Sequence, residues 1–473
     1  VDENGLVNYA EVIGSELVTN GDFSNGTTGW SEENSSTISV GTHQGRTNVA
    51  DINIGDTSSG SRIQQLFDYV NGKTYQISVD VYLVSGSFRS DSRDAFVSDD
   101  FVSTSTTGSW ITLTSTFTAI QTGQDVVWLR SLSEVSQFYV DSISIKEVQR
   151  DNVPRIDYTG GGCPHILAEP QRTNLVTYSE DFSNADWGNA SIGTTPVLTS
   201  GFISPDGTNN AYKISNANQD SMWFSATLIG ASDSRTIYAR TVSGTGTAQL
   251  LSHNSNTNNT FNLTEEWQRF EVSATTSGTG STSYYAVDFR GSGTLTELLI
   301  WGAQTEVGSY PTSYIPTNGE AGGVTRNQDI FTRDGIGSLI NSTEGVLFVE
   351  MAALSNDGTF RNISLNNGTT GQTVRIYYRN QDNKITVLIG SSSGASVTID
   401  VTDTLSFNKI AISYKVNDVR VFVNGSLEGT ITSVAMPVGL NELALDIANV
   451  LPFYGKVKQL QVYDTALTDE QLE

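Results

Sequence analysis

A phrase that occurs twice constrains the fold of this chain more than any other feature of its sequence. "LVTNGDFSNGTTGW" runs from Leu17 to Trp30, and "LVTYSEDFSNADW" runs from Leu175 to Trp187, so their first residues lie 158 positions apart. A phrase repeated at domain spacing indicates two copies of one folding unit in succession. We therefore expect each phrase to form the first strand of its own domain.

The segments that follow each opening phrase have the pattern of β-strands. In "KTYQISVDVYLV", apolar residues alternate with polar ones and place Tyr75, Ile77, Val79, Val81 and Leu83 on one face. Four segments of the first copy return in the same order in the second: "KTYQISVDVYL" as "SRTIYARTVSG", "GSWITLTSTFTAIQTG" as "EEWQRFEVSATTSG", "VVWLRSL" as "YYAVDFRG", and "FYVDSISIKEV" as "TELLIWGAQTEVG". We predict two antiparallel β-sandwiches of the same topology.

A third strand-rich unit starts near Glu344. Asn424-Gly425 is typical of a two-residue type I′ hairpin turn, and Thr468 with Gln471 is typical of a helix capping box near the end of the chain. The predicted fold is all-β, with three tandem antiparallel β-sandwiches. The predicted domains are an N-terminal anchoring segment at 1–14, a first module at 15–149, a connector at 150–174, a second module at 175–318, a connector at 319–342 and a last domain at 343–473.

The charge of the chain limits its partners. It has 51 acidic and 26 basic residues, for a net charge of -25. Such a surface repels nucleic-acid phosphates and anionic lipid, so we expect neither as a partner. No run of about eighteen apolar residues exists for membrane insertion, and the first residues lack the basic and apolar regions of a signal peptide.

The sequence offers little material for catalysis or for a metal centre. Cys163 is the single cysteine, and the three histidines, His43, His165 and His253, are far apart in sequence. Glu442 and Asp446 are the nearest approach to a pair of glycosidase acids. On one strand their spacing of about 13 Å exceeds the roughly 5–5.5 Å that a retaining pair needs. We expect no enzyme.

Two motifs of the first unit carry a family resemblance. The opening phrase Leu17–Trp30 and the closing strand Tyr139–Ile145 resemble "LVxNGDFxxGxxGW" and "YVDxIxI" of jelly-roll carbohydrate-binding modules. The resemblance implies a structural calcium at Asp22 and Asp141. Ser24 stands where the family usually has Glu, which removes one carboxylate from a site that needs six to eight oxygens. Capping of a turn by Asp22 is the alternative.

The last unit carries a second resemblance. Val421–Gly425 and Val462–Gln471 resemble the late motifs of concanavalin A-like or laminin-G-like lectin sandwiches, "VYVNG" and "(V/I)YxxALTxEE". This fold carries many functions, so the resemblance implies an architecture more than an activity.

The connectors, Asp151–Leu175 and Gly308–Phe331, are rich in Pro and Gly, and we expect them to stay outside regular sheet or helix. Their phrases at Glu169–Asn174 and Pro311–Thr317 resemble phrases of bacteriophage tail-fibre and other virion surface proteins. Plain spacing of domains is the alternative.

Aromatic side chains are the natural contacts for sugar rings. Five tryptophans recur at equivalent places of the two copies, which favours core packing for Trp30, Trp110, Trp187, Trp267 and Trp301. The aromatic residues without such a counterpart are the carbohydrate-binding candidates: Trp128, Trp223, Tyr377 and Tyr378. A structural role is the alternative for each of them.

These observations lead us to expect a non-catalytic bacteriophage protein on the virion surface, forming a fibre that binds host cell-surface glycans during adsorption. The alternatives are a secreted bacterial adhesin or polysaccharide-binding protein accessory to a glycosidase, and a capsid decoration without ligand. Residues 1–14 contain alternating apolar residues, and an unpaired strand invites pairing with another chain. We expect this segment to dock onto a virion protein or a symmetry mate in a homo-oligomer, with a trimer implied by the fibre resemblance. A flexible tail is the alternative.

Overall fold

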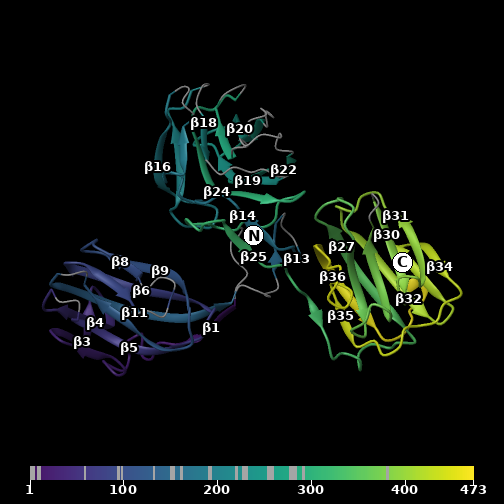
Figure 1. Ribbon diagram of the computed structural model, residues 1–473, viewed down its shortest axis with the longest axis horizontal. Coiled ribbons are helices and arrows are strands. Elements are labelled where there is room, and N and C mark those ends of the chain that lie inside the picture. The colour runs from purple at the N-terminus through teal and green to yellow at the C-terminus, as the bar shows by residue number, and fades with distance from the viewer. Residues whose placement is uncertain are drawn as a thin grey trace. The chain divides into compact units, whose positions relative to one another are not determined.

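The computed structural model is built almost entirely from β-strands (Figure 1). It describes residues 6–7, 12–57, 60–92, 96, 100–131, 134–149, 155–159, 163–189, 194–218, 222–225, 233–252, 260–275, 285–289, 293–379 and 383–472. The chain forms two compact units, Glu11–Val153 and Pro154–Glu473 together with Val1–Ala10. Within the described residues, no helix has the length and hydrophobicity that a membrane crossing requires.

The first unit is one β-sandwich, which we call module 1. A six-stranded sheet has the order β3-β4-β11-β6-β9, with β1 paired to β11, and a five-stranded sheet has the order β2-β5-β10-β7-β8. The strands are β1 (Val12–Glu16), β2 (Ser31–Glu33), β3 (Ser36–His43), β4 (Arg46–Ile54), β5 (Arg62–Tyr69), β6 (Thr74–Ser85), β7 (Phe88–Asp91), β8 (Asp100–Thr104), β9 (Trp110–Thr118), β10 (Gly123–Arg130) and β11 (Ser136–Gln149).

Alternation along the strands builds the core of module 1. The five residues predicted to share one face of β6 are all buried between the two sheets, whereas the residues between them are only partly buried. The prediction for this strand is confirmed, because successive side chains of a strand point to opposite faces.

Module 2 repeats the strand order of both sheets of module 1, except that its first sheet has no counterpart of β1 among the described residues. Its sheets have the orders β16-β17-β24-β19-β22 and β15-β18-β23-β20-β21. The strands are β15 (Trp187–Asn189), β16 (Val197–Phe202), β17 (Ala211–Ser215), β18 (Met222–Ser225), β19 (Asp233–Arg240), β20 (Gly246–Ser252), β21 (Thr260–Leu263), β22 (Gln268–Thr275), β23 (Tyr285–Asp288) and β24 (Leu298–Val307). The four predicted correspondences, β6 with β19, β9 with β22, β10 with β23 and β11 with β24, are confirmed.

The prediction that the repeated opening phrase forms the first strand of each copy was wrong, because in both copies the phrase runs through turns and bends and ends at a tryptophan, at or directly after which strands β15 and β2 begin. The indole of Trp30 donates to the carbonyl of Asn20 at 3.3 Å, and the indole of Trp187 donates to the carbonyl of Tyr178 at 2.9 Å. Both tryptophans are buried. The phrase is repeated because each sandwich needs its own buried Trp at this place.

The last domain is a sandwich of a seven-stranded sheet, β12-β13-β36-β27-β32-β33-β34, and a six-stranded sheet, β26-β35-β28-β29-β30-β31. Its apolar core lies between these sheets. The strands are β12 (Ile156–Asp157), β13 (His165–Ala168), β26 (Thr332–Arg333), β27 (Glu344–Ala353), β28 (Arg361–Asn366), β29 (Thr373–Tyr378), β30 (Lys384–Ile389), β31 (Ala395–Asp400), β32 (Asn408–Lys415), β33 (Val419–Val423), β34 (Ser426–Ile431), β35 (Glu442–Ala444) and β36 (Gly455–Tyr463). The predicted range 343–473 therefore omits β12, β13 and β26.

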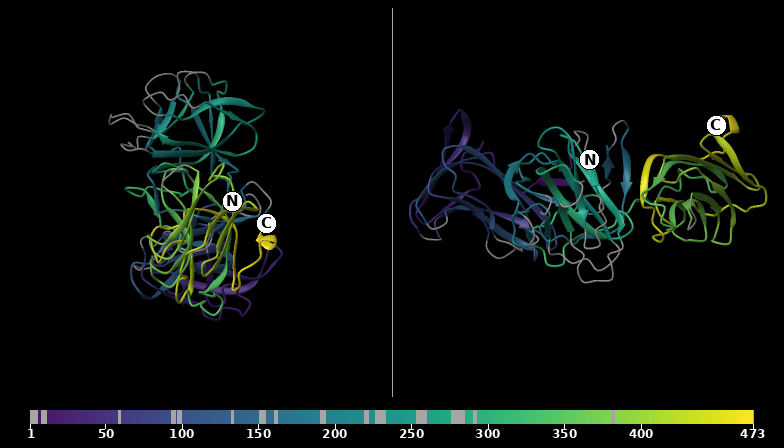
Figure 2. Two further views of the ribbon diagram at one scale, coloured as in Figure 1. Left: turned by 90° about the vertical axis from the view of Figure 1, so that its right-hand side faces the viewer. Right: turned by 90° about the horizontal axis from the view of Figure 1, so that it is seen from above.

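Two local predictions for this domain are confirmed. Asn424 and Gly425 have φ angles of 51° and 83° in the turn that joins β33 to β34, as a type I′ turn requires. The chain reaches helix α1 (Asp469–Leu472) after β36, near the C-terminal mark in Figure 2. The backbone N–H of Thr468 donates to Oε1 of Gln471 at 3.0 Å, which is one half of a capping box.

The connectors form more structure than their Pro and Gly content predicts. β13 adds to the edge strand β36, and β14 (Arg172–Asn174) pairs with β25 (Val324–Arg326). The connector strands β13, β14 and β25 have three or four residues and lie between the prolines, so Pro does not interrupt their pairing. The prediction that the connectors lack regular sheet was wrong.

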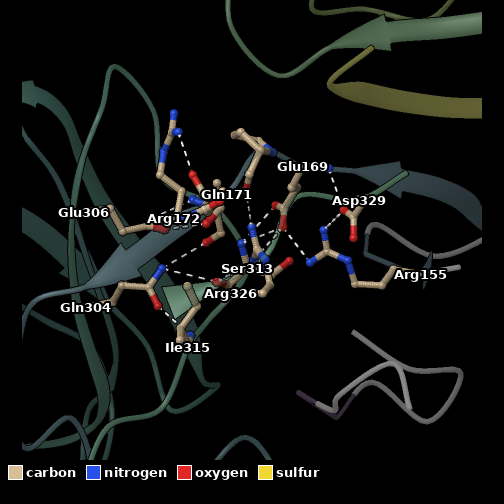
Figure 3. A network of polar contacts seen from close by, with 12 residues as sticks. Arg155, Glu169, Gln171, Arg172, Gln304, Glu306, Ser313, Ile315, Arg326 and Asp329 are labelled. Carbon is tan, nitrogen blue, oxygen red and sulfur yellow. Dashed lines mark hydrogen bonds and ion pairs between the residues drawn. The ribbon is translucent and has the colours of Figure 1, made fainter. Parts of the chain in front are cut away.

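The connector phrases meet in a buried ionic network (Figure 3). The Glu169 carboxylate lies 2.6 Å from Nη1 of Arg155 and 2.9 Å from Nη1 of Arg326, and it accepts the N–H of Ser313 at 2.9 Å. Asp329 also pairs with Arg155 and accepts the backbone N–H of Glu169 at 2.7 Å. The unusual composition of these phrases therefore has a structural role within this unit.

The N-terminal segment is partly paired within the chain. Residues Val12 and Ile13 lie in β1 and pair with β11. The Val7 N–H donates to the carbonyl of Pro205 at 2.9 Å, and Val7 packs beside Trp301. The premise that this segment has no partner of its own was wrong for these residues. Residues 1–5 and 8–11 lie outside the described part, so anchoring by residues 1–14 stays a prediction.

Candidate functional site

One outward face of module 1 gathers aromatic, charged and amide side chains. On the five-stranded sheet, Ile63 of β5 and Leu129 of β10 point into the core. Their neighbours along the strands point outward, because side chains alternate between faces. We call this set of outward residues the Trp128 face: Glu33, Arg62, Gln64, Arg89, Asp91, Trp128 and Arg130.

The half-buried indole of Trp128 lies between two guanidinium groups. The Cζ atoms of Arg62 and Arg130 lie 4.6 Å and 5.0 Å from its ring centroid, within cation–π range. Its N–H donates to Oε1 of Gln64 at 3.1 Å, and Nε2 of Gln64 donates to Glu33 at 2.9 Å. The ring is therefore held in one orientation with several polar groups around its edge.

A buried carboxylate fixes one side of this face. Asp91 is fully buried, and both of its oxygens accept Nε–H of Arg130 at 2.9 Å. Its Oδ2 also lies 2.5 Å from Nε of Arg89. Burial raises the pKa of Asp91, and the two guanidinium groups oppose that rise. The pair of arginines therefore depends on Asp91 for its position.

Module 2 has different residues at the equivalent positions. Gln64 stands between Ser31 and Trp128 in the register of module 1, and Phe224 stands between Gly188 and Ala286 in that of module 2. Ser31 directly follows Trp30, and Gly188 directly follows the equivalent Trp187, so Ser31 and Gly188 occupy the same place in the two modules. Across the strands from that place, Phe224 therefore corresponds to Gln64, and Ala286 corresponds to Trp128. Asp288 replaces Arg130 by the same register. Module 2 therefore does not repeat this face.

The four predicted sugar contacts differ in whether their rings are exposed. Trp128 lies half-buried on the outward face of module 1 described above. Trp223 is 9% exposed in the core of module 2, with its N–H donated to the carbonyl of Phe182 at 3.2 Å. Tyr378 is 3% exposed in the core of the last domain, where its hydroxyl donates to the carbonyl of Met351. These two predictions are corrected, because a buried ring offers no face to a sugar.

Tyr377 points the other way from its neighbour, as alternation requires. It is half-buried on the outward face of β29, next to Phe360, whose ring centroid lies 5.9 Å away. Tyr377 therefore remains a candidate contact in the last domain.

The two residues proposed for calcium have other partners. Oδ1 of Asp22 accepts the N–H and the hydroxyl of Ser24 at 3.2 and 2.9 Å, and these hydrogen bonds lower the pKa of Asp22. Asp141 pairs with Arg46 at 2.7 Å. Among the described residues, no group of three or more His, Cys, Asp or Glu is arranged to hold a metal ion. Calcium binding at Asp22 and Asp141 stays a prediction.

The outward face of the six-stranded sheet carries an aromatic cluster that the sequence analysis missed. The His43 ring stacks on Tyr139 with centroids 3.7 Å apart and meets Tyr82 edge-on at 4.6 Å. Trp110, which its repeat position assigned to the core, is half-buried here under Cζ of Arg46 at 4.3 Å. Alternation along β9 would have placed Trp110 outward.

The two acids considered for glycosidase chemistry lie in the last domain. Glu442 accepts Nδ2 of Asn366 at 3.0 Å, and Asp446 accepts the N–H of Asn449 at 3.1 Å. Burial raises the pKa of Asp446, with a smaller contribution from Glu442. Strand β35 ends at Ala444, so Glu442 lies in this strand and Asp446 lies beyond its end. The prediction that the two acids share one strand was wrong.

Two segments of the chain match protein families. Residues 15–130 match the family described as a carbohydrate binding domain, and residues 347–473 match the concanavalin A-like lectin/glucanases superfamily. The first match contains the whole Trp128 face. The chain therefore contains a carbohydrate-binding module and a concanavalin A-like lectin domain. No curated protein matches the chain.

Solved structures with some similarity include carbohydrate-binding and laminin domains. The CBM40 of the Ruminococcus gnavus IT-sialidase, bound to α2,3-sialyllactose, is 16% identical with a TM-score of 0.26, covering 30% of this chain and 96% of that one. The CBM22-1–CBM22-2 tandem of Paenibacillus barcinonensis Xyn10C has the same identity and TM-score over 64% and 100%. Domains LG4-5 of mouse laminin α1 are 12% identical with a TM-score of 0.22 over 58% and 92%. These values are too low to carry an argument.

Proposed function

We propose that this protein binds glycans without modifying them, and that the Trp128 face of module 1 is a binding site. The observation that carries the proposal is the half-buried Trp128 indole, bordered by Arg62, Gln64 and Arg130, within the segment that matches a carbohydrate binding domain. A pyranose ring has an apolar face that stacks on an indole, and its hydroxyls pair with the polar groups around that indole.

The face is suited to a neutral or weakly polar sugar chain. Asp91 pairs with both Arg89 and Arg130, and Glu33 accepts from Gln64. The surroundings of Trp128 therefore contain both donors and acceptors, and the three arginines of the face are offset in part by its two carboxylates. Because the side chains hold one another, little conformational entropy is lost on binding.

Electrophoresis of the full-length protein through gels that contain single polysaccharides tests this proposal. Wild type should be retarded by at least one polysaccharide, and Trp128→Ala should abolish that retardation. Trp267→Ala is the matched control, because Trp267 is also half-buried beside an arginine, with Cζ of Arg240 5.3 Å from its ring centroid, but lies in module 2. Equal retardation of wild type and Trp128→Ala would contradict the proposal.

We infer further that the protein is a bacteriophage virion surface protein, acting in a fibre that holds host cell-surface glycans during adsorption. The support is the resemblance of the connector phrases to virion proteins. A row of binding domains also suits multivalent attachment, since several weak sites gain avidity together. The test is to detect the chain in purified phage particles and to block adsorption with an excess of free protein. Its absence from particles would leave the glycan-binding proposal intact and remove this one.

Docking of residues 1–14 onto a virion protein or a second copy, with a trimer as the expected state, also remains a proposal. Because Val12 and Ile13 pair with β11, deletion of residues 1–10 is the cleaner variant. Light scattering should then show a smaller assembly than wild type. An unchanged mass together with unchanged incorporation into particles would contradict this role.

A further inference from the structure

A second polar face lies on the last domain, on the outside of its six-stranded sheet. Along β29, Val374, Ile376 and Tyr378 point into the core. Thr373, Arg375 and Tyr377 therefore point outward by alternation. This side of the sheet belongs to the concanavalin A-like domain and is separate from the Trp128 face.

One polar and one apolar side chain flank Arg375 near the centre of this sheet. In the register, Arg375 lies between Ser364 of β28 and Leu388 of β30, and Tyr377 lies between Asn362 and Thr386. The Cζ of Arg375 is 5.3 Å from the Tyr377 ring centroid. The site therefore combines one cation and one half-buried aromatic ring, beside buried hydroxyl and amide groups that already form hydrogen bonds within the domain.

Arg375 is buried without an acidic partner. It is 7% exposed, its Nε is buried with no hydrogen-bond partner, and within the described residues its guanidinium makes no hydrogen bond or ion pair. Burial lowers the pKa of Arg375, and no carboxylate opposes that change. Burying a cation without a counter-charge is costly, and the cation–π contact with Tyr377 offsets only part of that cost.

Other buried arginines of the same compact unit are each paired with a carboxylate. Arg235 lies 2.8 Å from Asp233, Arg361 lies 2.7 Å from Asp357, and the partly buried Arg155 pairs with Glu169. Of the three arginines that are buried in the described part of this unit, Arg235 and Arg361 pair with a carboxylate and Arg375 does not.

We propose that Arg375 binds the anionic group of an acidic sugar, a carboxylate or a sulfate, on the outward face of the six-stranded sheet. The planar guanidinium presents two parallel N–H donors that match either group. Tyr377 is placed to stack on the sugar ring beside it. Because the protein carries a net charge of -25, its overall field repels such ligands, and the binding must come from this local site.

Affinity electrophoresis of the full-length protein in dextran, carboxymethyl dextran and dextran sulfate tests the proposal. These polymers share a backbone and differ in the acidic group. Wild type should be retarded by at least one of the two acidic polymers and much less by dextran. Arg375→Gln should raise the apparent dissociation constant at least tenfold. The matched control is Arg379→Gln, near the end of the same strand, where Arg379 already donates to Thr398 at 3.0 Å. It should change the constant less than twofold.

The arms of this experiment separate the outcomes. Retardation by carboxymethyl dextran alone identifies a carboxylate ligand, and retardation by dextran sulfate alone identifies a sulfate. No retardation by either polymer, or equal losses in Arg375→Gln and Arg379→Gln, would overturn the proposal. Failure of Arg375→Gln to fold would also overturn it, because Arg375 would then have a structural partner. Trp128→Ala should bind the acidic polymers like wild type, which keeps this proposal distinct from that for the Trp128 face.

Discussion

At the scale of single residues, the Trp128 face depends on Asp91. This carboxylate is fully buried and holds Arg130 beside the indole, whereas Asp141 on the opposite sheet pairs with Arg46 near the surface, with exposed side-chain fractions of 26% and 37%. The two aspartates provide one buried and one exposed version of the same interaction.

We predict that Asp91→Asn destabilises module 1 by about 3 kcal/mol, because it leaves two partly buried guanidinium groups without their counter-charge. Asp141→Asn should cost less than about 1 kcal/mol, since exposed ion pairs contribute little. Urea unfolding followed by tryptophan fluorescence measures both values. Equal costs for the two substitutions would show that Asp91 does not organise the face.

Residue-level prediction from sequence succeeded where it used alternation and only in part where it used repetition, which placed Trp30, Trp187 and Trp301 in the core correctly but Trp110 wrongly. Alternation placed the inward residues of β6 correctly and would have separated Tyr377 from Tyr378, which are adjacent and must face opposite ways. The absence of a repeat counterpart selected Trp223 as a sugar contact, yet it is a core residue. A residue can be unique to one copy simply because the two cores are packed differently.

At the scale of elements, the connectors are parts of neighbouring sheets. β13 covers the edge of β36, and Glu169 follows directly after it. Sequence composition did not reveal these strands, because strands of two to four residues show too few alternations to be recognised. Their partners are also more than a hundred residues away in sequence.

We predict that a fragment of residues 343–473 is less stable than the same domain in the full chain, because it lacks β13 and exposes the backbone groups of β36. Hydrogen exchange should show the amide of Val457, which pairs with Ile166 of β13, protected in the full chain and exchanging rapidly in the fragment. A fragment that starts at 155 and carries module 2 should restore the protection. Equal protection in the short fragment would mean that β13 is dispensable.

The buried network around Glu169 predicts a response to acid. Burial raises the pKa of this carboxyl, but Arg326 and Arg155 outweigh burial and hold the pKa below its usual value. A carboxyl with a lowered folded pKa adds stability above its unfolded pKa of about 4.3, and that stability is lost as the pH falls through the folded value. Burial raises the pKa of Asp329 above the usual value of an aspartate, against the opposing effect of Arg155.

Glu169→Gln should therefore cost about 3 kcal/mol at neutral pH and progressively less below about pH 4, where wild type loses the same contribution. Thermal unfolding from about pH 7 to about pH 2 measures the difference between the two proteins. A difference that stays constant across this range would contradict the assigned role of Glu169.

At the scale of the whole molecule, sequence predicted the architecture and left the sites largely open. The repeated phrase, the alternating strands and the hairpin signal were enough to predict three antiparallel sandwiches, because the residue pattern of a strand lies within a short stretch of sequence. The Trp128 face and the site at Arg375 are defined by contacts between side chains of different strands and by the hydrogen bonds and ion pairs that these side chains form. A single sequence does not show which residues are in contact. Both sites became visible only through register, burial and missing counter-charges.

The central claim is that a glycan binds on the Trp128 face, and the indole N–H resonances of the full-length protein test it most directly. The chain has seven tryptophans, and Trp128→Phe assigns the signal in question. Titration with a polysaccharide that retards the protein should shift the Trp128 signal first, while the signals of the buried Trp223 and Trp301 stay in place. Saturable binding of that polysaccharide with an unmoved Trp128 signal would contradict the account.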